Sequence, residues 1–212
     1  IPLALNNEEK EEYKKINNKF LYWKYKLGDF DAFKTAKQIL ADNDATPQDK
    51  MAAARFFACI RERKKVVDFA SGKIDKLKQI VAENADKKIL VFGGANAFTD
   101  ILTEATFPMS LAYHSKKTVK QRREALEKFK SGDINVLCST KALNQGLDIP
   151  NASVGVICGL TSKSLTMIQR LGRLIRFEKG KEGTIYILYI KDSQEEKWLK
   201  ESVKTLKNIT WL

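Results

Sequence analysis

The residues best suited to chemistry lie between positions 136 and 176. Arg173 and Arg176 stand three positions apart in a helix-like segment, so both guanidinium groups would point to one side of a helix. Two parallel guanidinium groups suit a polyphosphate, because each offers forked N–H donors and neither loses its charge at neutral pH. The same stretch holds other polar residues that follow short apolar runs: Ser139, Thr140, Lys141, Gly146, Asp148 and Gln169.

The charge of the chain favours a polyanionic partner. The 212 residues include 38 Lys or Arg and 26 Asp or Glu, which gives a formal net charge of +12. Such an excess indicates nucleic acid first and an anionic membrane second, while an inert basic surface is the open alternative. The longest apolar runs, 154–160 and 185–190, are as short as strands, so no membrane span is expected.

The cysteines indicate the compartment of the protein, and the first residue indicates whether the chain is part of a longer one. Cys59, Cys138 and Cys158 form no CxxC pair, and they are expected to be buried thiols in a reducing compartment. No secretory signal is visible, so a cytoplasmic or nucleoid-associated protein is expected. Because the chain begins with Ile1 and not with Met, it is expected to be a fragment of a longer protein.

The first 70 residues predict helices rich in aromatic side chains. Asn6, followed by acidic residues, predicts a helix start, Gly28 predicts its end, and Thr46-Pro47 predicts the start of another helix. The aromatic positions recur at helical spacing. They are interpreted as core, with a ligand-binding surface as the alternative.

From residue 71 onward, short apolar runs alternate with amphipathic segments. This order predicts an α/β domain with a mostly parallel sheet covered on both faces. In such sheets ligands bind beyond the carboxyl ends of the strands. The expected strands are 88–92, 109–113, 134–138, 153–158 and 184–190, and the expected helices are 73–84, 93–105, 118–130, 139–147, 164–175 and 193–207. Polar segments follow four of these strands: 93–94, 114–117, 139–141 and 161–163.

Residues 73–192 resemble the second RecA-like domain of superfamily 2 helicases and translocases. Val91-Phe92 is similar to motif IV, and Tyr113-His114-Ser115 with Arg122 is similar to the stretch before motif V. Residues 139–150 match motif V, and Gln169-Arg170-x-Gly172-Arg173-x-x-Arg176 matches motif VI. The resemblance implies a RecA-like three-layer domain over 71–212, preceded by a helical linker or insertion over 1–70.

The resemblance also implies roles in binding ATP. Arg173 and Arg176 would be the catalytic arginines, reaching phosphates that another domain holds. Gly146 and Asp148 would lie near the nucleotide, and Gln169 would connect motif VI to the partner domain. Asp148 could alternatively only cap the turn before Pro150.

A second group of residues is expected to bind the nucleic-acid strand. Thr140, with backbone amides around Ser115 and Gly94, would contact strand phosphates, which positions a strand without reading its sequence. Phe92, Lys116 and Lys141 are assigned to the same surface. Phe92 could instead be core, Thr140 could be only a helix cap, and His114 is expected to be structural. Residues 116–130 carry seven Lys or Arg against two Glu, which is either a solvated face or part of this surface.

The motifs that are missing define what the chain can do alone. It contains no GxxxxGK[ST] loop and no Asp-Glu pair after a strand, so ATP and Mg²⁺ are expected to be bound mainly by an N-terminal RecA-like domain of the same parent chain. Hydrolysis by this chain alone is therefore not expected. Val119 stands where many DEAD-box RNA helicases have Gln, and with motif VI this favours DNA over RNA. A non-catalytic nucleic-acid-binding or scaffolding module remains the main alternative; a dinucleotide or nucleotide-sugar enzyme is disfavoured because GxGxxG is missing.

Overall fold

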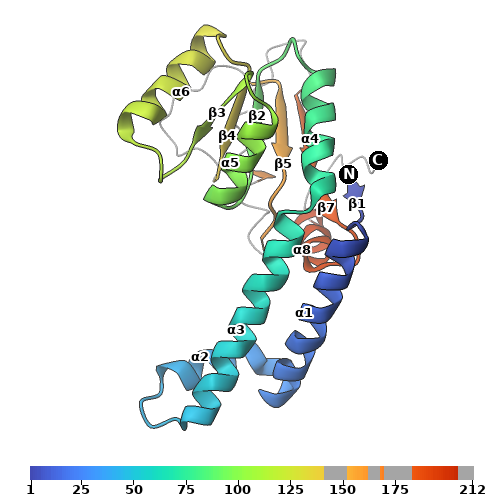
Figure 1. The fold of residues 1–212 in the computed structure, drawn as a ribbon, viewed down its shortest axis with the longest axis vertical. Helices are drawn as coiled ribbons and strands as arrows, with labels where there is room; N and C mark the ends of the chain where they lie inside the picture. The colour runs from blue at the N-terminus through green and yellow to red at the C-terminus, as the bar shows by residue number, and fades with distance from the viewer. Residues whose placement is uncertain (141–151, 162–167, 170–182, 205–212) are drawn as a thin grey trace. The chain divides into compact units, whose positions relative to one another are not determined.

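A computed structural model of the chain describes residues 1–140, 152–161, 168–169 and 183–204 (Figure 1). The chain divides into two compact units. One comprises Leu5–Phe69, and the other joins Ile1–Ala4 to Ala70–Leu212.

The helical unit is a set of helices with clear start and stop signals. The helices are α1 (Asn7–Lys26), a 3₁₀ turn (Asp29–Asp31), α2 (Ala32–Ala41) and α3 (Pro47–Asp68). Asn6 forms a capping box with Glu9, in which each side chain accepts a hydrogen bond from the other residue's backbone N–H at 2.9 and 3.0 Å. Gly28, with a φ of 91°, allows the left-handed turn that ends α1.

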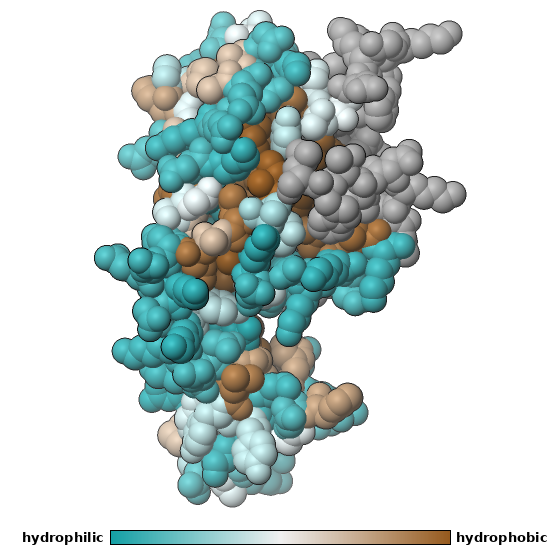
Figure 2. All heavy atoms as spheres, turned by 90° about the vertical axis from the view of Figure 1, so that its right-hand side faces the viewer, coloured by the Kyte–Doolittle hydropathy of each residue, from teal (hydrophilic) through white to brown (hydrophobic). Residues whose placement is uncertain are grey.

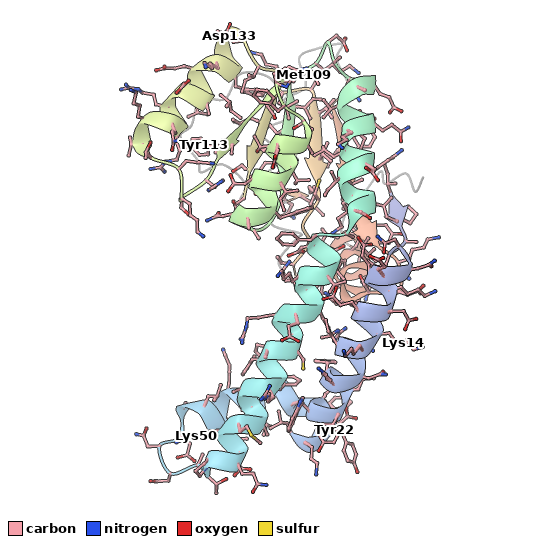
Figure 3. All side chains as sticks on the ribbon, in the orientation of Figure 1. Lys14, Tyr22, Lys50, Met109, Tyr113 and Asp133 are labelled. Carbon is pink, nitrogen blue, oxygen red and sulfur yellow. The ribbon has the colours of Figure 1, made fainter. Side chains whose placement is uncertain are left out.

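Aromatic side chains form the core of the helical unit, which confirms that interpretation of the sequence for part of the set. The ring of Phe20 stacks on that of Phe56 at 5.4 Å, and the guanidinium of Arg63 lies 4.1 Å above Phe20. Other aromatics stay outside this core: the side chain of Tyr22 is half exposed and points away from the helices in Figure 3. On the face shown in Figure 2 this unit is mostly hydrophilic, with its hydrophobic surface broken into small separate patches.

The second unit is built on a five-stranded parallel sheet in the order β3-β4-β2-β5-β6. A two-stranded parallel sheet pairs β1 with β7. The strands are β1 (Pro2–Leu3), β2 (Ile89–Phe92), β3 (Ser110–Tyr113), β4 (Val136–Ser139), β5 (Val154–Ile157), β6 (Thr184–Ile187) and β7 (Tyr189–Ile190). The described helices are α4 (Ser71–Glu83), α5 (Asn96–Ala105), α6 (Val119–Ser131) and α8 (Gln194–Val203).

Helices cover both faces of this sheet. On one face Leu90, Phe92 and Leu137 pack with Phe129 of α6 and Leu199 of α8. Side chains alternate between faces along a strand, so Cys138 lies on the opposite face, where it contacts the Thr103 hydroxyl of α5. Burial raises the pKa of the Cys138 thiol to about 12. The α/β three-layer fold with preceding helices, predicted from the sequence, is confirmed.

The structure differs from the sequence expectation at two places. The predicted strand 184–190 is two strands, β6 and β7, with Leu188 between them. The extended residues 2–3 pair with β7, so the start of the chain joins the α/β unit while 5–69 form the helical unit. The predicted helix 139–147 and most of the predicted helix 164–175 lie outside the described residues, as does the end of the one expected to reach 207.

A buried ion pair joins the first and the last described helices of this unit, α4 and α8. The ammonium of Lys73, in α4, lies 2.8 Å from the carboxylate of Glu195, in α8, and neither side chain is more than 1% exposed. The same carboxylate accepts hydrogen bonds from the backbone N–H groups of Leu160 and Ile190, at 3.3 and 3.1 Å. These extra bonds offset the cost of removing two charges from water.

Replacing Lys73 with Met should lower the free energy of unfolding by about 3–5 kcal/mol, because the Glu195 carboxylate would stay buried without its cation. Urea denaturation measures the loss. Lys78→Met, at an exposed position of the same helix, is the matched control and should have little effect. Equal losses in the two variants would contradict a structural role for the pair.

Candidate functional site

The predicted site residues that the structure describes gather where the parallel strands end. β2 ends at Phe92, β3 at Tyr113 and β4 at Ser139, and these residues are in register across the sheet. β5 ends at Ile157, in register with Phe92. The loops after these strands therefore leave from one edge, where open parallel sheets bind ligands.

Glycines let the loops after β2 and β5 touch through their backbones. Gly94 has a φ of +77°, and a Cβ there would lie 3.2 Å from the Cα of Gly159. A Cβ on Gly159 would overlap the carbonyl oxygen of Gly93, and one on Gly93 would lie 2.6 Å from the hydroxyl of Thr99. Larger residues would push the loops apart, so the placement of α5, which begins at Asn96, depends on these glycines.

Asn96 connects three of the strand-end loops. Its side-chain carbonyl accepts a hydrogen bond from the hydroxyl of Thr140, after β4, at 2.7 Å. Its amide donates to the hydroxyl of Ser115, after β3, at 3.4 Å. The hydroxyl of Thr99, one turn along α5, lies 3.3 Å from that of Thr140. The cluster of Asn96, Thr99, Ser115 and Thr140 is called here the strand-end cluster.

The strand-end cluster offers hydrogen-bond donors to a ligand. Ser115 accepts from Asn96, so its own O–H proton is free to point to another acceptor. Ala95, which precedes α5, provides no side-chain cap, and the first-turn N–H groups of a helix have no partner within the helix. These donors are neutral and suit an anionic oxygen at the positive end of the helix dipole.

His114 anchors the loop that carries Ser115. It is buried, and its Nε2 lies 2.9 Å from the carboxylate of Asp100 in α5, which also pairs with Lys117 at 2.9 Å. Partial burial acts to raise the pKa of the Asp100 carboxyl, but the hydrogen bonds from Lys117 and His114 outweigh it and lower that pKa. The contacts hold the loop on α5, which fits the structural role expected for His114.

The remaining predicted residues fall into three groups. Lys116 is exposed beside Ser115, and Gln169 is helical and exposed. Phe92 has no exposed surface and packs in the core, so its ring is not available to stack on a base in this structure. Lys141, Gly146, Asp148, Arg173 and Arg176 lie outside the described residues.

The structure adds residues that the sequence did not single out. Asn96 and Thr99 belong to the strand-end cluster, and Gly159 belongs to the loop contact. The only sequence signal for them is their place just after an apolar run or a Gly-Gly pair. Which strands are neighbours, and therefore which loops meet, is a property of the tertiary fold.

Two further findings bear on ligands. Within the described ranges, no three His, Cys, Asp or Glu side chains gather closely enough to hold a metal ion. Over the same part of the chain, no helix combines the length and the apolar character needed to span a membrane.

The chain is similar in sequence to known helicases and translocases. The profile of the family described as "Helicase conserved C-terminal domain" matches residues 72–178. The DNA 3'-5' translocase XPB2 of Sulfurisphaera tokodaii is 26% identical over 197 residues, which are 91% of this chain and 43% of that protein. The ATP-dependent RNA helicase DBP3 of Candida albicans is 31% identical over 134 residues, 58% of this chain and 23% of that protein. The chain thus spans less than half the length of these relatives.

A solved structure shares the fold over nearly the whole chain. The SWI2/SNF2 ATPase C-terminal domain of Sulfolobus solfataricus superposes with a TM-score of 0.61 over 97% of this chain and 85% of that one. The two sequences are 15% identical. The match extends beyond the α/β unit, because residues 70–212 alone are a smaller share of this chain.

Replacing Gly159 with Ala should destabilise the chain by about 1–3 kcal/mol, as other overpacking changes do. Because the added methyl group pushes on Gly93, hydrogen exchange should also rise in residues 93–99, on a different loop. Gly132→Ala is the control, since Gly132 has a φ of +92° with open space around it, and its effect should stay at the end of α6. Unchanged exchange in 93–99 would contradict the proposed loop contact.

Proposed function

Because the chain belongs to the helicase conserved C-terminal domain family, we propose that it is the second motor domain of an ATP-dependent DNA helicase or translocase. The family match and the relatives identify the chain as the C-terminal domain of a superfamily 2 helicase or translocase. The observation that carries the proposal is the strand-end cluster, which joins the loops after β3 and β4 to the start of α5.

The strand-end cluster is proposed to bind phosphates of one nucleic-acid strand. Thr140 gives its hydroxyl proton to the side-chain carbonyl of Asn96 and so orients the Asn96 amide. The Ser115 hydroxyl, that amide and the N–H groups at the start of α5, those of Asn96 and Ala97, are donors without net charge. Donors of this kind bind phosphate oxygens and leave base edges unread, so a motor could use them at any sequence. Exposed Lys116 and the basic residues of α6 place positive charge around the strand-end cluster, and this charge attracts the nucleic-acid strand.

The ATP side of the motor is proposed from motifs V and VI. Arg173 and Arg176 would bind phosphate oxygens of ATP and balance the charge that develops there, with Gly146, Asp148 and Gln169 as further contacts. When bound, ATP supplies a phosphoanhydride whose hydrolysis drives the motor. An N-terminal RecA-like domain of the parent protein would hold most of the nucleotide and the Mg²⁺ ion.

DNA is the proposed track. The match to a DNA translocase covers 91% of this chain, including the helical unit, whereas the match to an RNA helicase covers 58%. Val119 and the sequence of motif VI support the same choice. RNA is the alternative within this class, and a non-catalytic nucleic-acid-binding or scaffolding module is the alternative outside it.

In the parent protein, Arg173→Ala should lower ATP hydrolysis by roughly 10³-fold or more, because the variant loses an arginine that stabilises transition-state charge. Steady-state phosphate release measures the effect. Arg61→Ala is the matched control, since Arg61 is an exposed arginine on α3, outside the surface assigned to nucleic acid. Near-normal turnover of Arg173→Ala would reject Arg173 as the catalytic arginine.

Thr140→Val keeps the shape of the side chain and removes the hydroxyl from the strand-end cluster. The Kd of this chain for single-stranded DNA should rise about threefold to tenfold, because Asn96 loses the hydrogen bond that orients its amide, with a similar factor for DNA of any sequence. Fluorescence anisotropy over a series of salt concentrations measures both the Kd and its salt slope. Ser131→Ala removes a hydroxyl from the far end of α6 and should leave the Kd unchanged.

Loss of affinity for only some sequences in Thr140→Val would contradict the phosphate assignment, because phosphates carry no base identity. A wild-type Kd that hardly changes between low and moderate salt would contradict it as well.

A further inference from the structure

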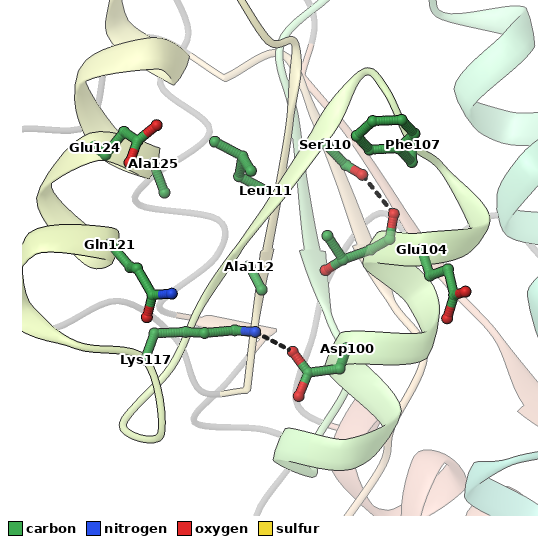
Figure 4. Close-up of a pocket in the computed structure, with 11 residues that line it drawn as sticks. Asp100, Glu104, Phe107, Ser110, Leu111, Ala112, Lys117, Gln121, Glu124 and Ala125 are labelled. Atoms are coloured by element: carbon green, nitrogen blue, oxygen red, sulfur yellow. Dashed lines mark hydrogen bonds and ion pairs between the residues drawn. The ribbon is translucent and has the colours of Figure 1, made fainter.

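Grooves in the two units differ in how their charges are balanced. A groove over β3, between α5 and α6, is lined by three carboxylates, of which Asp100 pairs with Lys117 at 2.9 Å and Glu124 with Lys128 at 2.8 Å (Figure 4). Another groove, of about 690 Å³, lies in the helical unit between α1 and α3 and is called here the helical-unit groove. Its volume is within the range of about 300–1,000 Å³ that is typical of ligand sites.

The helical-unit groove has cations that are not paired within the described part of the chain. Lys19 of α1 and Arg55 of α3 line it, both are exposed, and neither forms an ion pair with a described residue. Lys26, two turns along α1 from Lys19, is exposed and has no ion pair there either. Glu62 is the carboxylate that lines the groove, and it lies about 10 Å along α3 from Arg55. Three cations thus face one distant carboxylate, which favours an anionic ligand.

An exposed aromatic ring lies among these cations. Tyr22 is on the same face of α1 as Lys19 and Lys26, because the three positions are spaced i, i+3 and i+7. It is 54% exposed and points away from the helices in Figure 3. The ammonium of Lys26 lies 5.9 Å from the centroid of its ring, and the ring of Trp23 meets it edge-on at 4.9 Å. These contacts hold the ring in place while it remains accessible to a ligand.

The combination of cations and an exposed ring suits a single strand of nucleic acid. Cations bind the phosphates of such a strand, and aromatic rings stack on its unpaired bases. Lys19 and Lys26 are about 10 Å apart along α1, which is the length of about three nucleotides at about 3.4 Å each. A duplex would offer the same phosphates but keeps its bases stacked on one another. An acidic peptide would offer carboxylates without a series of flat rings.

We propose that the helical-unit groove binds a single strand of nucleic acid, with phosphates on Lys19, Lys26 and Arg55 and a base stacked on Tyr22. Every base has a π face, so this contact would tolerate any sequence. The site belongs to the helical unit and is distinct from the strand-end cluster. It rests on the proposed function in one respect, since a nucleic-acid motor makes nucleic acid the polyanion that the chain meets.

Photocrosslinking of the full chain tests the proposal. The probe is a thymidine strand of about 20 nucleotides carrying 5-iododeoxyuridine, a base that reacts on irradiation with an aromatic ring stacked against it. Mass spectrometry identifies the crosslinked residue, and the yield at Tyr22 over a series of strand concentrations gives the Kd of this site. The single strand should crosslink to Tyr22, and the same strand annealed to its complement should give at least about fivefold less product.

Charge variants separate this groove from general attraction to a basic protein. Lys19→Glu should raise the Kd measured at Tyr22 at least about tenfold, because attraction to phosphate becomes repulsion, whereas Lys19→Arg should leave it within about twofold. Lys14→Glu is the matched control, since it makes the same charge change at an exposed lysine of α1 outside the groove, and its effect should stay within about threefold.

Four outcomes would overturn the proposal: no crosslink at Tyr22, equal yields with single strand and duplex, equal effects of Lys19→Glu and Lys14→Glu, or equal competition by unlabelled strand and by polyglutamate. The assay uses neither ATP nor the rest of the parent protein. Its failure therefore leaves the motor assignment in place, and that assignment is tested by ATP hydrolysis.

Discussion

The contact between Gly93–Gly94 and Gly159 is the constraint on which the site depends. The loops that follow the parallel strands β2 and β5 lie so close together that their backbones are in contact and no Cβ fits between them. The contact fixes where the chain turns into α5, and α5 then sets the position of Asn96. Two hydrogen bonds follow from that position: Asn96 donates to Ser115 after β3 and accepts from Thr140 after β4. The proposed phosphate-binding surface is thereby assembled from parts that are far apart in the sequence.

Two surfaces of the α/β unit differ in the charged and polar groups that they present. The strand-end cluster uses hydroxyls, an amide and helix N–H groups, with lysines around them, which suits an anionic polymer that must be held and released at any sequence. The groove over β3 is lined by carboxylates and apolar side chains, and two of its carboxylates are paired with Lys117 and Lys128. Beneath both, the buried pair of Lys73 and Glu195 joins α4 and α8 and is itself satisfied by backbone N–H groups. Asp100 connects the two surfaces, because it lines the groove and also holds His114 beneath Ser115.

Much of the fold follows from the sequence because the signals are local. The apolar run 88–92 and the cap Thr118, which forms a capping box with Gln121, predict β2 and the start of α6 to within a residue or two. The pairing of residues 2–3 with β7 was not predictable, since two apolar residues do not indicate which strand they will pair with, here one that lies 187 positions away. For the same reason Asn96 was missed: its role depends on the strand order β3-β4-β2, which brings the loops that carry Ser115 and Thr140 within reach of its side chain. Phe92, an aromatic residue at a strand end, could not be assigned to core or to surface before its neighbours were known.

The measurement that tests the central claim most directly is ATP hydrolysis by the parent protein, with single-stranded DNA, forked DNA, duplex DNA or RNA added in turn. We expect hydrolysis to be slow without nucleic acid, and we expect at least one form of DNA to stimulate it more than any RNA does. Stimulation by RNA alone would contradict the choice of DNA while leaving the motor assignment in place. Absence of hydrolysis with every nucleic acid would contradict the motor itself, and the strand-end cluster would then belong to a module that only binds.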